Sequence, residues 1–285
     1  MIALQVNNIK HCYHDGTMAL RGTQLNVKKR EILAILGPNG SGKTTLLKHL
    51  NGLLKPSGGE VLLMGKSLRK YSSKEIFLKI GMVFQDPNDQ LFAPTVWDDV
   101  AYGPTNLGLG KDEIHRRVDE ALQLTGMAHC TQKSVNALSF GQKKRICVAG
   151  VLAMKPEILL LDEPTCGLDP AGVHSIMLLL KELNNMHGIT IIMSTNCVDL
   201  VPVYMDRLAI MYQGLILKTG SPEDVFTDEQ IIKQASLELP QIAQLMQILR
   251  EKDCVSMKSL PLTVREAGDF LAHRLNSNSE FVAPN

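Results

Sequence analysis

Long hydrophobic runs are missing from this sequence of 285 residues, although 45% of its residues are apolar. No stretch approaches the roughly 20 consecutive apolar residues that a membrane-spanning helix needs, and the N-terminus has no signal-peptide pattern. The apolar fraction is enough for the core of one large domain, or of a domain with an appendage. We therefore expect any association of the chain with a membrane to be peripheral.

Paired cysteines and an excess of charge are missing as well. The six cysteines form no C-x-x-C pair, which favours reduced thiols in the cytosol. With 30 basic and 29 acidic residues, the net charge of +1 gives no support to a nucleic-acid partner. His11 and His14 alone offer too few ligands to predict a metal site.

One glycine-rich segment, Gly37 to Thr44, fits the pattern G-x-x-x-x-G-K-[ST] at every fixed position. It follows an apolar run at 31–36 that is typical of a buried strand, and it precedes a helical pattern at 45–50. In this context backbone N–H groups and a helix N-terminus converge on phosphate oxygens. Lys43 is expected to reach the β- and γ-phosphates of a nucleoside triphosphate, and the Thr44 hydroxyl to bind Mg²⁺. The expected nucleotide-binding residues are Gly37, Pro38, Asn39, Gly40, Ser41, Gly42, Lys43, Thr44 and Thr45.

A second buried strand is predicted at 158–161, where four aliphatic residues stand in a row. It leads into Asp162 and Glu163, at the edge where parallel sheets bind ligands. We expect this strand to neighbour the strand of the phosphate loop, so that Asp162 holds Mg²⁺ directly or through water. Glu163 is expected to take the proton from the attacking water.

The segment Leu138 to Arg145 resembles the signature L-S-G-G-Q of the ATP-binding-cassette ATPases. Ser139 can cap the helix that follows, and Gln142, three residues on, can reach back to it, as in a capping box. The resemblance implies that Ser139, Gly141 and Gln142 face the γ-phosphate of an ATP bound by a second subunit. Two chains would then enclose two ATP molecules head to tail.

This resemblance covers residues 2–230 and implies further roles. Gln85 matches the family's glutamine that senses Mg²⁺ and the attacking water, and Asp169 matches a residue at the subunit contact. Tyr13 stands where the family has an aromatic ring that stacks on adenine, although a packed strand tyrosine is the alternative.

The fold that the resemblance implies is α/β. It consists of a P-loop NTPase core, an antiparallel β subdomain and a helical signature lobe. We expect helices at 111–124 and 139–154 in this lobe, and strands around Leu4 and Val6 and around Leu25 and Val27.

Residues 84–104 resemble the ATPases of energy-coupling-factor importers, which take up vitamins or transition metals. Residues 138–154 and 198–202 are most similar to the cobalt/nickel type. Three prolines are expected to confine a short helix to 95–101. The resemblance implies that the Gln85–Pro104 surface receives a helix of the membrane-embedded partner. Inward packing is the alternative for Leu91, Phe92 and Trp97.

Two residues depart from the family's pattern. Asn196 occupies the position of a histidine that follows a strand in a serine–threonine–histidine run. An amide can donate a hydrogen bond to the γ-phosphate, but it cannot carry a proton charge at neutral pH. Phe140 stands where the signature has glycine, so a side chain is expected to project near the subunit interface. Asn196 joins Glu163 and Gln85 as an expected catalytic residue.

A C-terminal appendage is expected at 236–285, after a nucleotide-binding domain at 1–235. Two amphipathic helical patterns follow Pro240, and Thr263 with Glu266 fits a capping box. Energy-coupling-factor ATPases carry an appendage of about this size that helps to hold the ATPase pair together. Packing without a role in dimerisation is the alternative.

The leading hypothesis is the ATP-hydrolysing subunit of an importer of cobalt or nickel, using ATP and Mg²⁺ at the cytoplasmic face of the cell membrane. ATP binding would close a dimer with a second copy or a related ATPase, and hydrolysis would reopen it, without contact to the transported substrate. The alternatives are vitamin import, a hydrolysis-impaired ATP-gated switch, and the impaired half of an asymmetric pair. A cassette ATPase of DNA repair or translation is disfavoured, because the interval from Gln85 to Ser139 is too short for a long coiled-coil insertion.

Overall fold

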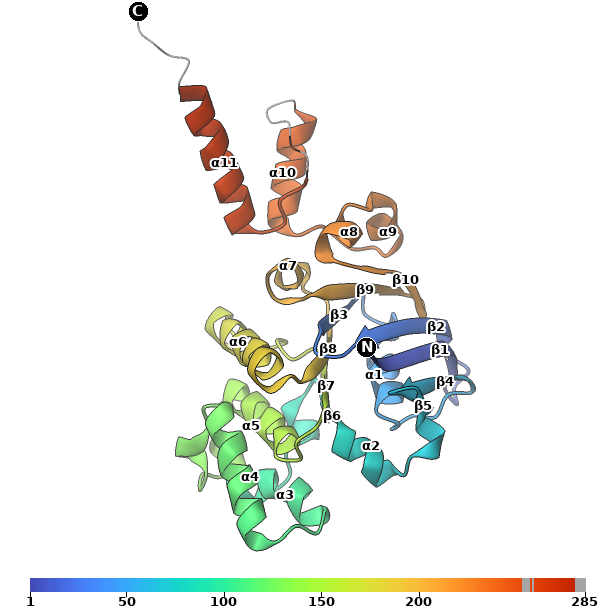
Figure 1. Cartoon of the computed structure of the whole chain (residues 1–285), viewed down its shortest axis with the longest axis vertical. Coiled ribbons are helices and arrows are strands. Elements are labelled where there is room, and N and C mark those ends of the chain that lie inside the picture. Colours follow the sequence, from blue (N-terminus) through green and yellow to red (C-terminus); the bar gives the residue numbers. More distant parts are fainter. Residues whose placement is uncertain (253–256, 258, 280–285) are drawn as a thin grey trace, which may run out of the picture.

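The computed structural model describes residues 1–252, 257 and 259–279, and a six-stranded sheet forms its centre (Figure 1). The strand order is β10-β9-β3-β8-β7-β6; neighbours from β9 to β6 are parallel, and β10 is antiparallel to β9. The bounds are β3 Ile32–Leu36, β6 Ile80–Val83, β7 Ile158–Asp162, β8 Thr190–Thr195, β9 Arg207–Tyr212 and β10 Leu215–Gly220. Every residue of β3, β7 and β8 is buried, which explains their continuous apolar runs.

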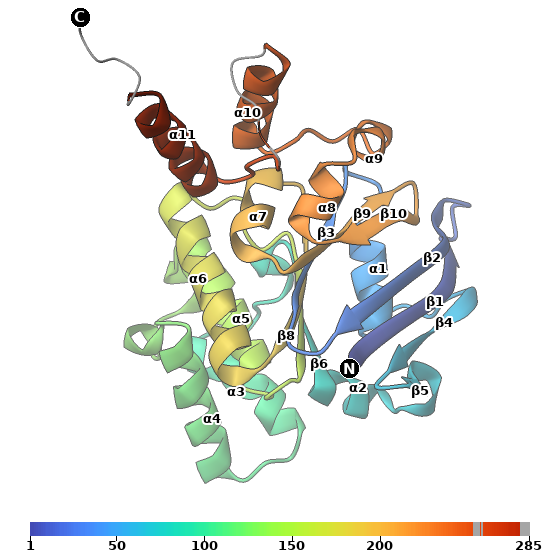
Figure 2. The same cartoon turned by 45° about the horizontal axis from the view of Figure 1, so that its top comes forward.

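A second, antiparallel sheet lies across helix α1 (Lys43–Leu50) from the central sheet (Figure 2). Its strand order is β2-β1-β4-β5, with bounds β1 Ile2–Cys12, β2 Met18–Lys28, β4 Gly58–Leu63 and β5 Lys66–Ser67. Leu46, Leu47 and Leu50 of α1 join one apolar cluster with strands of both sheets. The phosphate-loop helix is therefore fixed from two sides. Helix α2 (Ser73–Lys79) follows this sheet.

Helices α3 (Val96–Asn106), α4 (Lys111–Leu124) and α5 (Phe140–Leu152) form the helical lobe, and α6 (Pro170–His187) covers the face of the central sheet opposite α1 (Figures 1 and 2). Helix α4 has the predicted bounds, whereas the helix predicted at 95–101 is longer in the structure. Pro104 lies inside α3, where it removes a single intrahelical hydrogen bond near the helix end. The Thr105 hydroxyl meanwhile donates to the Ala101 carbonyl at 2.7 Å.

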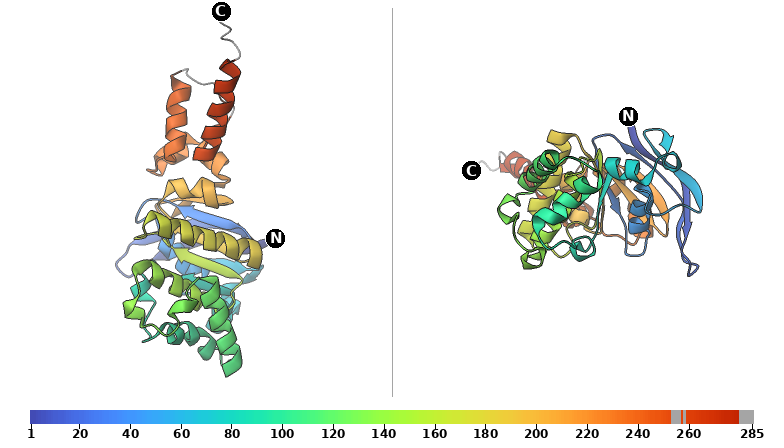
Figure 3. Two further views of the ribbon diagram at one scale, coloured as in Figure 1. Left: turned by 90° about the vertical axis from the view of Figure 1, so that its left-hand side faces the viewer. Right: turned by 90° about the horizontal axis from the view of Figure 1, so that it is seen from below.

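Short helices connect the larger elements, and two longer ones project from the body. The short ones are η1 Leu68–Lys70, η2 Pro87–Asp89, η3 Ala128–Cys130, η4 Val135–Ala137, η5 Val198–Leu200, α7 Val201–Tyr204, α8 Pro222–Phe226 and α9 Glu229–Gln234. The projecting pair is α10 (Gln241–Glu251) and α11 (Val264–Ser279) (Figure 3). Leu239, Ala243 and Leu262 at its base join the apolar core of the lobe and the central sheet, so the pair is anchored at one end.

The capping box predicted at the start of α11 is confirmed. The Glu266 N–H donates to the Thr263 hydroxyl at 3.2 Å, and the Thr263 N–H donates to the Glu266 carboxylate at 3.3 Å. Leu245 and Val264 of the pair are exposed, because the pair projects away from the body. Residues 253–256, 258 and 280–285 of the predicted appendage lie outside the described residues. Within the described chain, no helix has both the length and the apolarity needed to cross a membrane.

Candidate nucleotide-binding site

The glycine loop connects β3 to α1 and depends on its missing side chains. Gly40 and Gly42 have φ angles of 78° and 105°, in the left-handed region. A Cβ on Gly37 would lie 2.2 Å from the Met211 carbonyl oxygen, and one on Gly42 would lie 2.7 Å from the Ala19 carbonyl oxygen. The loop therefore follows a path that is open to glycine alone at these positions, and it delivers the N-terminus of α1 to the edge of the sheet.

Lys43 folds back into the concave side of this loop. Its Nζ donates to the carbonyl oxygens of Gly37 at 2.7 Å and Pro38 at 3.3 Å, and it lies 3.5 Å from Oε1 of Glu163. The ammonium is buried, so its contacts are made with little screening by water. The terminal phosphates of a nucleotide would bring their charge to this ammonium, in competition with the Glu163 carboxylate.

The Asp162 carboxylate is held from two elements. One of its oxygens accepts from the Thr44 hydroxyl at 2.7 Å, and the other accepts from the Ser194 hydroxyl at 2.6 Å. The Ser194 hydroxyl also accepts from the Glu163 N–H at 2.9 Å. The Thr44 hydroxyl and the Asp162 carboxylate together provide the oxygen ligands that Mg²⁺ prefers, so the residues fit this ion.

The expectation that β7 neighbours β3 is wrong. Strand β8 lies between them, and its Ser194 faces Asp162 across the parallel pair of β7 and β8. The intervening strand is what brings Ser194 against Asp162 and Glu163. The sequence carried a signal for Ser194, since it ends an apolar run that is typical of a buried parallel strand.

A cavity of about 570 Å³ opens at this edge of the sheet and is called the nucleotide cavity below. It gathers most of the predicted site residues: Tyr13, Asn39, Gly40, Ser41, Gly42, Lys43, Thr44, Thr45, Gln85, Glu163 and Asn196. Its wall also contains four residues that sequence reasoning missed, Thr17, Met18, Ala19 and Cys166. Gly37, Pro38 and Asp162 do not line it; Asp162 is buried behind Thr44.

Side chains at the rim of the nucleotide cavity are held to different degrees. The Tyr13 hydroxyl and the Thr45 hydroxyl are hydrogen-bonded at 2.9 Å, which fixes the half-exposed ring beside α1. The Gln85 amide donates to the Cys166 thiol at 3.8 Å. Asn196 is exposed, and its side chain makes no hydrogen bond within the described part of the chain, so it is free to reach a ligand.

The signature segment lies outside the nucleotide cavity of its own chain. Ser139 caps α5 as predicted: its hydroxyl accepts from the Gln142 N–H at 3.3 Å, and its own N–H donates to the Gln142 side chain at 3.0 Å. The cavity wall contains none of Ser139, Gly141 and Gln142. Their role toward nucleotide in a second subunit stays a prediction.

Within residues 84–104, the rings divide between the core and solvent. Leu91 and Trp97 pack against the core, as the alternative for them states, whereas Phe92 and Tyr102 are exposed by 65% and 52%. These two rings meet edge to face, with centroids 4.7 Å apart. The Asp99 carboxylate accepts from the Phe92 N–H at 3.0 Å and fixes the backbone beneath the pair. An exposed aromatic surface is therefore present, built on two rings.

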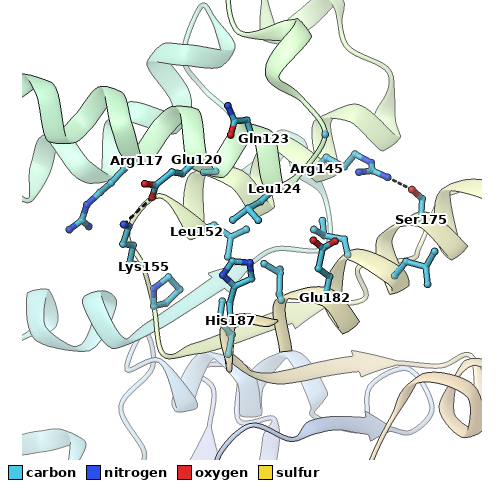
Figure 4. A pocket seen from close by; sticks show the side chains of 17 residues that line it. Arg117, Glu120, Gln123, Leu124, Arg145, Leu152, Lys155, Ser175, Glu182 and His187 are labelled. Atoms are coloured by element: carbon cyan, nitrogen blue, oxygen red, sulfur yellow. Dashed lines mark hydrogen bonds and ion pairs between the residues drawn. The ribbon is translucent and has the colours of Figure 1, made fainter. Parts of the chain in front are cut away.

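A larger cavity of about 890 Å³ lies between α4, α5 and α6 (Figure 4) and is called the helical cavity below. Its cationic side chains have partners within the chain. Arg145 donates to the Thr125 carbonyl at 2.7 Å and to the Ser175 hydroxyl, and Lys155 lies 3.0 Å from the Glu120 carboxylate. Arg117, also in this wall, lies 2.6 Å from the Glu113 carboxylate, so each of the three lysine and arginine side chains that line the helical cavity makes a contact within the chain.

Residues 20–166 match the family of ABC transporters. The energy-coupling factor transporter ATP-binding protein EcfA of Methanocaldococcus jannaschii is 50% identical over 260 residues, covering 90% of this chain and 93% of that protein. The chain belongs to the ABC transporter ATPases of energy-coupling-factor type. The protein EcfA2 of Clostridium perfringens is 48% identical to this ATPase, with 93% of each chain covered.

Solved structures agree with the fold of this ATPase. The structure of cbiO1 from Clostridium perfringens, part of the ABC transporter complex cbiONQ, superposes with a TM-score of 0.75 and is 46% identical, covering 86% of this chain and 99% of that one. A dimeric post-hydrolysis state of the cassette MJ0796, bound to ADP and Pi, superposes with a TM-score of 0.70. It is 29% identical, covering 77% of this chain and 98% of that one. The ATPase is the ATP-binding subunit of an energy-coupling-factor transporter, and it hydrolyses ATP in support of transport.

Proposed function

We propose that this ATPase drives an importer of cobalt or nickel from the cytoplasmic face of the cell membrane. The metal assignment is supported by the resemblance of residues 138–154 and 198–202 to the cobalt/nickel type, and the similarity to cbiO1 of the complex cbiONQ extends over 99% of that chain. ATP binding closes a head-to-tail dimer with a second copy or a related ATPase, and hydrolysis reopens it. The ATPase itself makes no contact with the transported substrate, and a vitamin importer is the competing assignment.

The nucleotide cavity supports a division of labour among its residues. The N–H groups at 39–45 and the Lys43 ammonium bind the phosphates, and the Tyr13 ring stacks on the adenine. Thr44 and Asp162 would hold Mg²⁺, with Gln85 completing the site; the ion supplies neutralisation of phosphate charge. Glu163 takes the proton from water, since its carboxylate already lies 3.5 Å from Lys43 at the phosphate end. Asn196 donates to the γ-phosphate, and Ser139, Gly141 and Gln142 of the second subunit close the site.

Two surfaces would serve the partners. Phe92 and Tyr102 within the Gln85–Pro104 surface provide an exposed apolar patch for a helix of the membrane-embedded subunit. The projecting pair of α10 and α11 carries the exposed Leu245 and Ile248, which suit a contact between two ATPase chains. Residues 1–235 then act as the nucleotide-binding domain and 236–285 as a dimerisation appendage.

One substitution tests how Asn196 affects the motor. Under this proposal the Asn196→His variant should release phosphate from Mg-ATP within a few-fold of the parent rate, because the Asn196 amide still offers an N–H donor, whereas a missing transition-state donor would slow the parent on the order of 100-fold. A parent rate within a few-fold of the variant supports an unimpaired motor. If the histidine variant alone turns over, the second candidate, the impaired half of an asymmetric pair, replaces the first. The observation that favours this candidate is the asparagine at position 196, whose amide cannot carry the proton charge of the family's histidine.

Substrate identity needs the complete importer. We expect membrane vesicles that contain the ATPase and its membrane partners to accumulate radioactive cobalt or nickel when Mg-ATP is supplied on the ATPase side. Vesicles carrying Glu163→Gln serve as the control for uptake that is independent of hydrolysis. Uptake of a vitamin, with neither metal accumulated, would replace the metal assignment and leave the ATPase assignment intact.

A further inference from the structure

Lys144 is a buried lysine on the signature helix α5, and it does not line the nucleotide cavity. Only 2% of it is exposed, and its Nζ donates to the backbone carbonyl of Glu163 at 3.1 Å. Within the described residues no carboxylate lies close enough to form an ion pair with it. Burial lowers the pKa of Lys144, and the neighbouring Cys166 and Cys147 oppose this shift more weakly.

A buried ammonium is costly to place there. Taking a charge from water costs several kcal/mol unless it is well paired, and an apolar side chain of similar length would fill the same space without that cost. The hydrogen bond to Glu163 is therefore the feature that distinguishes lysine from methionine at this position.

The acceptor of this hydrogen bond belongs to a strained residue. Glu163 has a φ angle of 45°, which is unusual for a residue with a side chain. Four contacts hold it: its N–H donates to the Ser194 hydroxyl, its carbonyl accepts from Lys144 and from the Cys166 N–H at 3.1 Å, and its carboxylate lies 3.5 Å from Lys43. Two of these contacts come from the P-loop core, one comes from the loop that follows Glu163, and the Lys144 contact comes from the helical lobe.

Phe140, the departure from the signature, closes this contact from the outside. The Lys144 Nζ lies 5.4 Å from the centre of the Phe140 ring. The same ring packs on Gly167, where φ is 76° and an added Cβ would lie 2.8 Å from a ring atom. The ring thus covers the ammonium and touches the loop that follows Glu163, within one chain.

We infer that Lys144 is a positioning residue that transmits the position of the signature helix α5 to the catalytic carboxylate of Glu163. When α5 moves relative to the central sheet, the hydrogen bond moves the Glu163 carbonyl, and the strained backbone carries that movement to the side chain. Phe140 keeps the contact dry and links it to Gly167. This inference rests on the proposed role of Glu163 as the base that accepts the proton from water.

The experiment compares steady-state hydrolysis of Mg-ATP by the full chain and by Lys144→Met, Lys144→Gln and Lys79→Met. Lys144→Met should lower kcat about tenfold while KM for ATP and the affinity for a fluorescent ATP analogue stay the same, since the bond acts on the base and not on the phosphates. Lys144→Gln retains an N–H donor and should recover most of kcat. Lys79 pairs with Glu157 at the surface, so Lys79→Met controls for the loss of a lysine.

A double variant separates this inference from the role of Glu163. In single-turnover hydrolysis of radiolabelled ATP, adding Lys144→Met to Glu163→Gln should change the rate less than twofold, because Lys144 acts through Glu163. If Glu163→Gln hydrolyses ATP at the parent rate, the base assignment fails and the inference fails with it. If Glu163→Gln is slow but Lys144→Met matches Lys79→Met, the positioning role alone is wrong. A loss in Lys144→Met that raises KM, lowers the thermal unfolding midpoint and is not recovered by glutamine would show a purely structural lysine.

Discussion

The nucleotide cavity and the helical cavity meet opposite ends of helices. The N-terminus of α1 opens into the first, and its N-cap residue, Gly42, has no side chain to occupy the free N–H groups. The last turns of α4 and α6 line the second, and the C-terminal end of a helix dipole carries a partial negative charge. The helix dipoles therefore favour phosphate at the first cavity and oppose it at the second, although the second is larger. Helix polarity, rather than volume, marks the nucleotide site.

The sharpest test of this difference makes one substitution in each cavity. Glu163→Gln should lower ATP hydrolysis by about 10²–10⁴-fold, because the amide cannot accept the proton from water. Glu182→Gln makes the same change in the wall of the helical cavity and should leave the rate unchanged. Phosphate release under saturating Mg-ATP measures both. Equal rates for the two variants would remove the catalytic distinction between the cavities.

A pair of lysines tests the binding side of the comparison. Lys43→Ala should weaken ATP binding at least about 30-fold, because it removes a buried charge that faces the phosphates. Lys155→Ala removes a surface lysine whose partner is Glu120, and it should change ATP affinity less than twofold. Equilibrium titration with a fluorescent ATP analogue measures both affinities. Weaker binding in Lys155→Ala would indicate that nucleotide also uses the helical cavity.

Much of this site could be predicted because its chemistry lies in short, contiguous motifs. The loop at 37–44 and the pair Asp162–Glu163 each contain their own context, a strand before and a turn or helix after. The capping box of Ser139 and Gln142 is equally local, since its partners are three residues apart. Local order of this kind is visible without knowledge of the tertiary fold.

The parts that could not be predicted depend on contacts between distant segments. Ser194 reaches Asp162 only because β8 lies between β3 and β7, an order that the sequence does not state. Lys144 looks like one more charge in a basic run until α5 packs it beneath Glu163. The length of α3 could not be predicted either, because Pro104 lies within the helix near its end, where the loss of one intrahelical hydrogen bond does not stop it. Predicting each of these three features requires knowledge of how helices and strands pack together, which a sequence pattern within one helix or strand does not contain.

The smallest predicted effect concerns pH and again compares one residue from each region. His49 is buried in the last turn of α1, where its Nδ1 donates to the Thr45 carbonyl at 2.7 Å and its Nε2 has no partner within the described residues. Burial lowers the pKa of His49; the Thr45 carbonyl opposes this shift, and the His11 ring, 4.7 Å away, adds to it. The folded chain therefore binds fewer protons at His49 than the unfolded chain does as the pH falls below about 6.5.

Stability should accordingly fall as the pH is lowered from 7.5 to 5.5, and the contribution of His49 should level off below its folded pKa. His49→Gln removes the titrating group, so its urea unfolding midpoint should fall less over this range than that of the parent. His187→Gln, at the exposed end of α6 beside the helical cavity, is the matched control and should follow the parent. Parallel curves for all three proteins would mean that the folded chain charges His49 as readily as the unfolded chain does.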